Sequence, residues 1–224
     1  MLPLSIVILL SYMVGSIPTS IIITKLSRNI DIREHGSGNA GGTNVIRVLG
    51  LREGLFVIVL DFLKGYAAPM LVARLMVGPF PFNNRTPFED YTVVQIIAGC
   101  SAILGHVWTM FGGFRGGKGI ATACGVLIGL APVEMTVSLT IFLIVFVISG
   151  YVSLGSISAS MAFPLAMLLR HNVFHADLYG YHTLIYFSIG ITMLLIYTHR
   201  ANIKRLKEGT EHKLTDLKFV KKSP

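Results

Sequence analysis

Long apolar runs, separated by short polar segments, occupy most of the chain. A helix needs about 20 mostly apolar residues to cross the hydrocarbon core of a bilayer, so we predict a spanning helix wherever a run approaches that length. Two of the runs meet at Pro132, which favours a tight turn between helices, and the first of these two runs is short for a complete crossing. The predicted spans are residues 2–24, 55–77, 93–111, 120–131, 133–149, 157–169 and 181–197.

The composition favours a membrane protein over a soluble one. Hydrophobic residues make up 53% of the chain and charged residues only 13%, whereas about 25% charged residues are usual in soluble domains. So few charges cannot cover a globular surface in water, but lipid can cover what they leave bare. We predict an all-α polytopic membrane protein with about seven transmembrane helices. It forms a single membrane domain over residues 1–224, with glycine-rich loops, short helical segments and a basic tail at 199–224.

The positions of the basic residues predict the orientation. No Lys or Arg precedes the first span, which therefore lacks the positive start of a cleaved signal peptide, and Lys25, Arg28 and Arg33 follow it directly. With the N-terminus placed outside, fifteen Lys and Arg residues fall on the inner side and three on the outer side. Cytoplasmic segments are enriched in these residues. We therefore expect a cytoplasmic C-terminus, and the net charge of +8 requires no nucleic-acid partner.

Three further features have structural interpretations. Residues 79–90 are rich in Pro and Asn and predict an exposed outer loop. The basic tail from Lys204 to Pro224 can rest on anionic membrane lipid. Cys100 and Cys124 lie inside apolar runs and have no metal-like spacing, so we expect two thiols packed among helices.

The first segment with candidate chemistry is residues 36–44, on the inner side after the first span. Its glycines let the backbone fold closely and point several N–H groups inward, which makes an anion site. The apolar residues that follow predict a short helix, whose first N–H groups favour phosphate. The alternative is a flexible solvated loop. The candidate ligands are Gly36, Ser37, Gly38, Asn39, Thr43, Asn44 and, in the short helix, Arg47.

A second glycine-rich segment, residues 112–119, lies on the same side and runs directly into the helix predicted from Ile120. A lysine flanked by glycines at a helix start again fits phosphate chemistry. The segment does not satisfy the Walker A pattern, so ATP hydrolysis has little support. His106 precedes the segment and is by itself more often a packed histidine than a base. The candidate residues are Gly116, Gly117, Lys118 and Gly119.

Further polar residues on the inner side flank the last spans. The ordinary interpretation of the run after residue 198 is a basic membrane flank, and that of serines between spans is helix capping. Their coincidence with the two glycine-rich segments favours instead an anionic substrate at the inner membrane surface. The candidates are His199, Asn202, Arg205 and Glu211 after the last span, and Ser153 and Ser156 in the turn before residue 157.

Asp61 and Lys64 are charged residues inside a predicted span. Their spacing puts them on one helix face, and each unpaired charge would cost about 2.5–3.5 kcal/mol in the membrane. We predict that they pair with each other near the inner surface. A structural brace and a supporting role behind the site, together with His106, fit equally well.

Taken together, these segments resemble the three motifs of a bacterial family, the integral-membrane, acyl-phosphate-dependent glycerol-3-phosphate acyltransferases. Two departures from the family pattern are Gly42, where alanine is usual, and Trp108-Thr109, where an aromatic-proline pair is common. The first motif is carried by residues 15–20, Arg33, residues 36–39, Thr43, Asn44 and Arg47. The second is carried by Gly105, His106, Phe114 and residues 116–122, and the third by His199, Arg200, Asn202, Arg205, Gly209 and Glu211.

This resemblance implies acyl transfer from acyl-phosphate to the 1-hydroxyl of glycerol-3-phosphate, giving lysophosphatidic acid and inorganic phosphate, the first step of bacterial phospholipid synthesis. It implies a cytoplasmic-membrane enzyme whose partners are these substrates and membrane lipid, with no cofactor and no metal. No His-x4-Asp pair, typical of the acyltransferases that use thioester donors, occurs in the chain. The expected catalytic residues are Ser37, Lys118, His199 and Asn202, with His199 or a substrate phosphate oxygen as the base, and the other candidates would bind substrate.

Three other classes stay in competition at this point. A transporter of phosphorylated metabolites predicts sites near the membrane midplane and some repeat symmetry, and the chain shows neither clearly. A purely structural membrane subunit would not need three polar loops. A lipid-phosphate phosphatase would need a histidine-rich signature that we do not find.

Overall fold

The structure is a computed structural model that describes residues 3–75, 90–178 and 180–214. Most of the predicted outer loop at 79–90, and the tail from residue 215 onward, lie outside the described residues. Within the described part every regular element is helical. The α-helices are α1 (Leu4–Gly15), α2 (Thr19–Arg28), α3 (Gly42–Leu49), α4 (Leu51–Ala67), α5 (Asp90–Val107), α6 (Ile120–Leu130), α7 (Pro132–Ser149), α8 (Val152–Asn172), α9 (Tyr181–Thr198) and α10 (Arg200–Lys207), and the short helices are η1 (Ile32–Glu34), η2 (Ala68–Val72), η3 (Ala73–Leu75) and η4 (Met110–Gly112).

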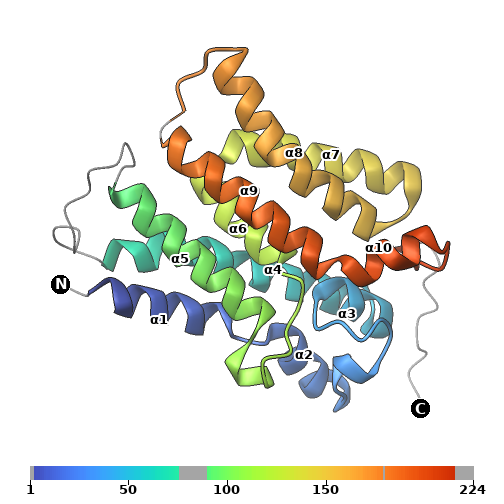
Figure 1. The fold of residues 1–224 in the computed structure, drawn as a ribbon. Helices are drawn as coiled ribbons and strands as arrows, with labels where there is room; N and C mark the ends of the chain where they lie inside the picture. Colours follow the sequence, from blue (N-terminus) through green and yellow to red (C-terminus); the bar gives the residue numbers. More distant parts are fainter. Residues whose placement is uncertain (1–2, 76–89, 179, 215–224) are drawn as a thin grey trace.

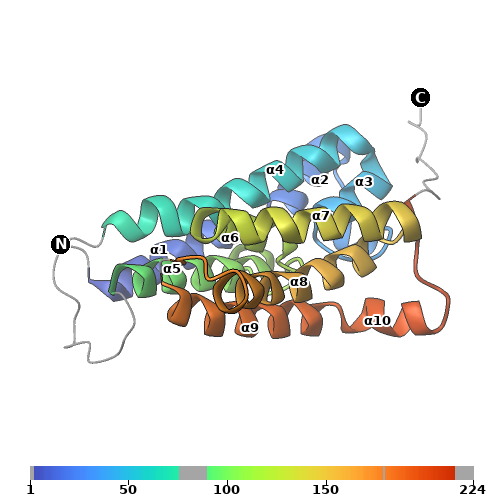
Figure 2. The ribbon, with the colours of Figure 1, turned by 90° about the horizontal axis from the view of Figure 1, so that it is seen from above.

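The helices form an elongated bundle whose two ends differ in character (Figures 1 and 2). One end, here called the motif end, consists of residues 29–50, 110–119, 150–151 and 199–214. Its helices α3 and α10 lie at the right of both views, and the segment after α5 lies nearer the middle. At the opposite end α1 begins, α6 meets α7 and α8 connects to α9. All three glycine-rich or basic segments therefore converge at one end of the bundle.

The number and length of the apolar helices confirm an all-α polytopic membrane protein. Among the described residues, six helical stretches are long and apolar enough to cross a membrane, and α6 is a further, shorter apolar helix. With a rise of about 1.5 Å per residue, α6 covers only about half of the roughly 30 Å hydrocarbon core. The predicted seven spans therefore correspond to six full-length stretches and one short helix. The predicted turn at Pro132 is confirmed, since α7 begins there.

The predicted first span is not one continuous helix. It is broken after Gly15 into α1 and α2, because Pro18 cannot continue the hydrogen-bond ladder. The carbonyl groups freed by the break are satisfied by distant side chains: Thr109 donates to the Ser16 oxygen, and Lys64 Nζ donates to the Ile17 oxygen at 2.8 Å. A broken helix is tolerated inside a membrane protein when its backbone groups find such partners.

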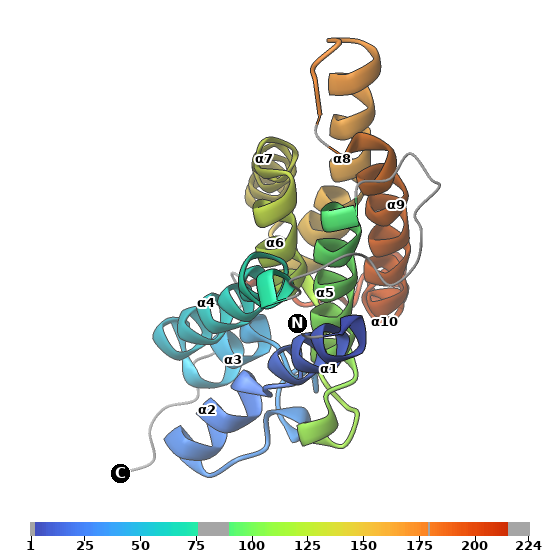
Figure 3. The ribbon, with the colours of Figure 1, turned by 90° about the vertical axis from the view of Figure 1, so that its left-hand side faces the viewer.

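Glycines allow two helix pairs to approach closely. A Cβ on Gly15 would lie 2.0 Å from the Ala102 carbonyl oxygen, between α1 and α5. Between α4 and α6, a Cβ on Gly65 would lie 2.0 Å from the Thr122 oxygen and one on Gly125 would lie 2.0 Å from the Phe62 oxygen. Small residues at helix contacts are the usual means of close packing in membranes. Figure 3 shows α4 beside α6 and α1 beside α5.

The α4–α6 contact supports a first prediction. Gly125→Ala should lower the free energy of unfolding by about 1–3 kcal/mol, because the new methyl group meets a backbone carbonyl that cannot rotate away. Gly190→Ala in α9 is the matched control, since its Cβ would have nothing within 4 Å, and we expect no loss there. Thermal unfolding of both variants in detergent micelles tests this. Equal melting temperatures would contradict the close packing of α4 on α6.

The start of α8 corrects the predicted boundary of the sixth span. The helix begins at Val152 rather than at residue 157, so Ser153 and Ser156 lie in its first turns and not in a loop. Both are buried. The helix also continues through Pro164 to Asn172. This places two candidate hydroxyl groups on a rigid helix that faces the motif end.

Candidate active site

The carboxylate of Glu211 joins residues from three parts of the chain. Its Oε1 accepts hydrogen bonds from Asn202 Nδ2 at 2.6 Å and from Ser153 Oγ at 2.9 Å, and its Oε2 accepts one from Arg205 Nε at 2.7 Å. Burial acts to raise the pKa of Glu211, but these three hydrogen bonds outweigh it and the pKa is lowered. Glu211 is therefore a buried anion with its oxygens fully engaged.

The segment after α10 brings Glu211 to this position. Residues 208–214 fold back along the motif end, where the Leu214 N–H donates to the Gly150 oxygen at 3.1 Å and Arg47 donates to the His212 oxygen at 3.4 Å. Up to residue 214, the predicted basic tail is thus anchored to the motif end by these contacts and by buried Asn202 and Glu211, while most of its side chains are exposed. Contact of the tail from Lys204 onward with anionic lipid stays a prediction.

Lys118 is held at the centre of the same network. Its ammonium group donates to Asn202 Oδ1 at 2.5 Å, and its backbone oxygen accepts from the Thr198 hydroxyl at 3.1 Å. Burial lowers the pKa of Lys118 to about 8, with the positive charges of Arg205 and Arg47 acting in the same direction and Glu211 opposing them. The lysine is therefore a cation at neutral pH, and a nearby anion would stabilise its charge.

The charges around Lys118 do not balance. Arg47, Lys118 and Arg205 bring three positive charges, and Glu211 brings one negative charge. In addition, Arg47 Nε is buried without a hydrogen-bond partner among the described residues. A buried donor without a partner is costly. Two uncompensated positive charges and an unused guanidinium donor together indicate a site for a dianion such as a phosphate monoester.

His199 lies beside this cluster with one ring nitrogen occupied. Its Nδ1 is 2.8 Å from the Leu195 carbonyl oxygen, which can only accept, so Nδ1 carries the proton and Nε2 keeps its lone pair. Burial lowers the pKa of His199 to about 4, assisted by the charge of Lys118. The imidazole is therefore neutral at physiological pH and has the correct tautomer to accept a proton at Nε2.

Asn44 holds the first glycine-rich loop together instead of presenting its amide to a ligand. Its Nδ2 donates to the backbone oxygens of Ile32, His35 and Asn39, and its Oδ1 accepts from the Ser37 N–H at 2.8 Å. The Asn44 side chain is buried and its hydrogen bonds are made within the loop, and a direct contact with substrate stays a prediction. The predicted short helix is confirmed as α3.

At two positions of the first loop region, only glycine fits the space that is available. Gly36 has φ +61, and a Cβ there would lie 2.3 Å from Asn44 Oδ1. A Cβ on Gly42 would lie 2.4 Å from Ile58 Cγ1 and 3.0 Å from the Gly54 oxygen. Gly42 therefore lets α3 pack closely against α4.

The second glycine-rich loop is packed against the end of α5. The N–H groups of Gly116 and Gly117 donate to the Val107 and His106 oxygens at 3.1 and 3.2 Å. Cβ atoms at the same two glycines would lie 1.9 Å from the His106 oxygen and 2.3 Å from His106 Nε2. Their N–H groups thus have backbone partners, and the close packing of these two glycines positions the loop that carries Lys118. That they also bind substrate stays a prediction. Gly119, with φ +86, then starts α6.

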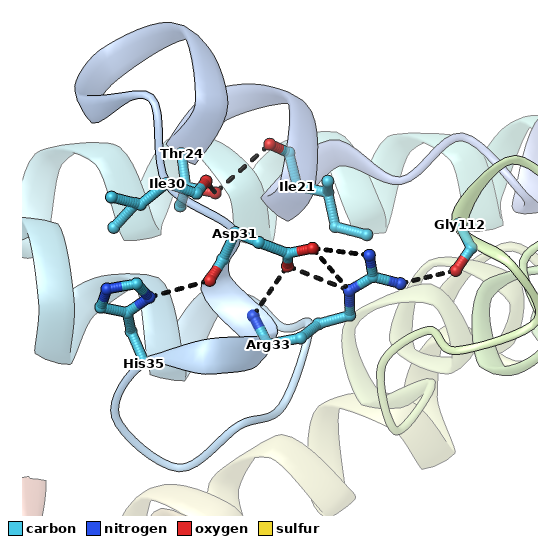
Figure 4. Close-up of polar contacts among 7 residues, drawn as sticks. All are labelled: Ile21, Thr24, Ile30, Asp31, Arg33, His35 and Gly112. Atoms are coloured by element: carbon cyan, nitrogen blue, oxygen red, sulfur yellow. Dashed lines mark hydrogen bonds and ion pairs between the residues drawn. The ribbon is translucent and has the colours of Figure 1, made fainter.

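Arg33 and Asp31 connect the first loop to the second, a clamp that sequence reasoning did not identify (Figure 4). Arg33 makes a two-pronged ion pair with Asp31 and donates to the Gly112 oxygen at 2.6 Å. The hydrogen bond from Arg33 lowers the pKa of Asp31 to about 2. The one feature of the sequence that could have pointed to this clamp was the position of Arg33 in the first motif. The clamp holds the two loops in register across a long sequence separation.

The predicted pairing of Asp61 with Lys64 is present behind these loops. The Lys64 ammonium lies 2.9 Å from Asp61 Oδ1, which also accepts from the Thr19 hydroxyl at 2.5 Å, and His106 Nδ1 lies 3.5 Å away. His106 in turn contacts Gly117. The cluster therefore supports the loop that carries Lys118, and Thr19 is a member that the sequence did not reveal.

The remaining candidate residues make no hydrogen bond, among those given for the described residues, to the network around Glu211 and Lys118. The Ser156 hydroxyl donates to the Val152 oxygen of its own helix at 2.9 Å. The Gly38 N–H donates to the His35 oxygen at 3.1 Å. The loop nevertheless reaches the second one, because the Ala40 oxygen would lie 2.9 Å from a Cβ on Gly117. Three partly exposed residues of this region, Ser37, Asn39 and Thr43, have side chains in positions open to a ligand at the motif end.

Comparison with known proteins identifies close relatives. Residues 5–209 match the family described as glycerol-3-phosphate acyltransferase. The chain is 48% identical to the glycerol-3-phosphate acyltransferase of Chlorobaculum tepidum, over 93% of this chain and 95% of that one, and 43% identical to that of Chlorobium phaeobacteroides, over 96% and 97%. Two crystal structures of PlsY, an integral membrane glycerol 3-phosphate acyltransferase, are 34% identical and cover 94% of each chain. The glycerol 3-phosphate form aligns with a TM-score of 0.79 and the lysophosphatidic acid form with 0.77.

Proposed function

Because this chain belongs to the glycerol-3-phosphate acyltransferase family and is an acyltransferase, we propose that it transfers an acyl group from acyl-phosphate to the 1-hydroxyl of glycerol-3-phosphate. The products are lysophosphatidic acid and inorganic phosphate, as expected for the first step of bacterial phospholipid synthesis. The known forms of the similar crystal structures, one with glycerol 3-phosphate and one with lysophosphatidic acid, are consistent with this acceptor and product.

The observation that carries the proposal is the charge imbalance around Lys118. Arg47, Lys118 and Arg205 outnumber Glu211, and Arg47 Nε has no protein partner among the described residues. In the proposed complex the phosphate of glycerol-3-phosphate receives hydrogen bonds from Arg47 and Lys118. Charge-assisted bonds of this kind are about twice as strong as neutral ones. Glu211 keeps Arg205 and Asn202 fixed, so that the site needs little rearrangement on binding.

The acyl-phosphate head group is proposed to lie against the first loop, near Ser37, Gly38 and Asn39. Acyl-phosphate is a mixed anhydride with a good leaving group, so the protein mainly orients the two reactants and stabilises developing charge. The acceptor hydroxyl oxygen forms a bond to the acyl carbon, and the bond from that carbon to the phosphate oxygen breaks. The hydroxyl proton passes to His199 Nε2 or to a phosphate oxygen and leaves with the inorganic phosphate.

The role of His199 can be separated from that of the substrate phosphate. With a pKa of about 4 the histidine is a weak base, so we expect His199→Ala to lower kcat only about a hundredfold, the lower end of the range for general bases. The measurement is phosphate release between pH 5 and 8, with His212→Ala, an exposed histidine of the same end, as the control. Near-normal turnover of His199→Ala across this range would assign the proton to a phosphate oxygen.

One assay tests the proposed reaction. Purified protein receives acyl-phosphate and glycerol-3-phosphate without nucleotide or thioester, and lysophosphatidic acid and phosphate are measured together. A parallel reaction with acyl-coenzyme A identifies the donor. Equal amounts of both products with acyl-phosphate alone support the proposal. Folded protein that makes lysophosphatidic acid only from acyl-coenzyme A would overturn the proposed donor.

We also propose that the motif end faces the cytoplasm, with the N-terminus outside, in the bacterial cytoplasmic membrane. The asymmetry of Lys and Arg supports this orientation, and a water-soluble acceptor would be supplied from that side. Thiol labelling of a cysteine introduced at exposed Lys204, in intact cells compared with inverted vesicles and in a background lacking Cys100 and Cys124, tests it. Labelling in intact cells would contradict the proposed orientation and place the motif end outside.

A further inference from the structure

Two residues at the junction of α9 and α10 hold Lys118, one at each end of the lysine. The Thr198 hydroxyl donates to the Lys118 backbone oxygen at 3.1 Å, and Asn202 Oδ1 accepts from the Lys118 ammonium group at 2.5 Å. Thr198 is the last residue of α9, which runs directly into α10 (Figure 1). A spacing of four residues puts Thr198 and Asn202 on one side of the helix. A single helical turn therefore holds both the backbone and the side chain of the lysine.

The single hydroxyl hydrogen of Thr198 has two acceptors within reach. One is the Lys118 oxygen, and the other is the Leu195 oxygen of its own helix, at 2.9 Å. The Leu195 oxygen already accepts from the backbone N–H of His199 at 3.1 Å and from its Nδ1 at 2.8 Å. A carbonyl oxygen has two lone pairs, and both are in use there. The hydrogen of the Thr198 hydroxyl therefore belongs to the bond with Lys118.

The residues just before Lys118 are attached to a different helix. The N–H groups of Gly116 and Gly117 donate to backbone oxygens at the end of α5, whereas His199 follows the end of α9. The Thr198 hydroxyl is thus the contact through which the backbone of Lys118 is tied to the helix that carries His199. Misplacing a catalytic group by about 1 Å can cost about a hundredfold in rate, so this tie has a direct bearing on turnover.

We propose that Thr198 is a positioning residue for acyl transfer, and that its hydroxyl fixes Lys118 relative to His199 without touching either substrate. The proposal rests on the proposed function, since Lys118 is the residue that binds the phosphate of glycerol-3-phosphate there. Thr198 holds the lysine backbone at the place from which its side chain reaches both Asn202 and that phosphate.

The first test removes only the hydroxyl. In Thr198→Val the Lys118 oxygen loses its donor, and we expect kcat/KM for glycerol-3-phosphate to fall roughly tenfold, less than for a full 1 Å displacement because Asn202 still holds the ammonium group. Thr198→Ser keeps the hydroxyl and should restore most of the lost rate. A Thr198→Val protein with unchanged kcat/KM, or a Thr198→Ser protein as slow as Thr198→Val, would overturn the proposal.

Thr192 provides a matched control in the same helix. Its hydroxyl donates to the Ser160 oxygen of α8 at 2.7 Å, so it makes the same kind of bond to a neighbouring segment, away from the motif end. Thr192→Val should lower the melting temperature in detergent micelles about as much as Thr198→Val does. It should leave the kcat/KM of the folded protein unchanged. An equal fall of kcat/KM in both variants would reduce Thr198 to a residue of helix packing.

The pH dependence gives a second measurement, which a loss of folded protein does not imitate. Burial lowers the pKa of Lys118 to about 8, and kcat/KM should decline as the pH rises through that value. In Thr198→Val the lysine is less firmly held and more open to water, so its pKa rises and the decline moves to higher pH. A decline at the same pH in both proteins would contradict the positioning role. The substitution changes none of the other groups that face the lysine, which are Arg47, Arg205, Glu211 and neutral His199.

A third measurement needs no acyl donor. Calorimetric titration with glycerol-3-phosphate alone should show binding weakened roughly threefold or more in Thr198→Val and unchanged in Thr192→Val. If the unmodified protein makes no lysophosphatidic acid from acyl-phosphate, the proposed reaction fails, and this difference in binding still tests Thr198. If the unmodified protein is active and Thr198→Val equals it in both binding and turnover, only the positioning role fails.

Discussion

Lys118→Met is expected to lower kcat/KM for glycerol-3-phosphate by about a thousandfold. The lysine is the central cation of the site, held by Asn202 at 2.5 Å and buried beside two arginines. Removing a buried charged partner of a ligand typically costs 2–5 kcal/mol or more, and a lost donor to developing charge lowers kcat about 10²–10³-fold. Lys204→Met is the matched control, because the same substitution at an exposed position of α10 should change the rate less than about twofold.

The pH dependence of the same residue provides an independent measurement. Because the pKa of Lys118 is lowered to about 8, the free protein loses this charge as the pH rises through 8, and kcat/KM should fall there. Lys118→Arg keeps its charge beyond pH 12, so the alkaline decline should disappear even if the variant is slower overall. A decline at the same pH in both proteins would assign it to another group and remove Lys118 from the phosphate site.

Local sequence patterns predicted most of the fold. Apolar length identified the spanning stretches, because the hydrophobic thickness of a membrane imposes one scale on every helix that crosses it. The pairing of Asp61 with Lys64 followed from their spacing on one helix face. The break between α1 and α2 was missed although Pro18 signals it, because the residues on both sides of it are apolar. The carbonyls that the break exposes are satisfied by Lys64 and Thr109, which no local pattern relates to residue 16 or 17.

Which residues gather at the site was easier to predict than the role of each residue there. The sequence brought Lys118, Asn202, Arg205 and Glu211 into one list, and the structure joins them in one network. Asn44 was expected to bind substrate, and the structure shows that its side chain ties its own loop together. An amide beside glycines is equally suited to both tasks. Only the hydrogen-bond partners, some of them many residues away, distinguish a ligand from a brace.

The supporting cluster behind the site is expected to dominate stability. Asp61 and Lys64 are 1% and 7% exposed, and the carboxylate also accepts from Thr19. Removing one member of a buried ion pair leaves an uncompensated charge that costs about 3–5 kcal/mol. We therefore expect Asp61→Asn to lower the free energy of unfolding by that amount, measured as a loss of thermal stability in detergent micelles.

Removing both charges should cost less than removing the carboxylate alone. In Asp61→Asn with Lys64→Met both charges of the pair are removed, so neither is left buried without its partner, although the Ile17 oxygen loses its donor. We expect the double variant to recover at least half of the stability lost in Asp61→Asn. A double variant that loses as much stability as its two single variants together would mean that the two residues act independently.

The same cluster should affect activity only through folding. Because His106 of this cluster contacts Gly117, the cluster supports Lys118 without touching the substrate. We therefore expect the activity of the double variant to follow its folded fraction, with an unchanged KM.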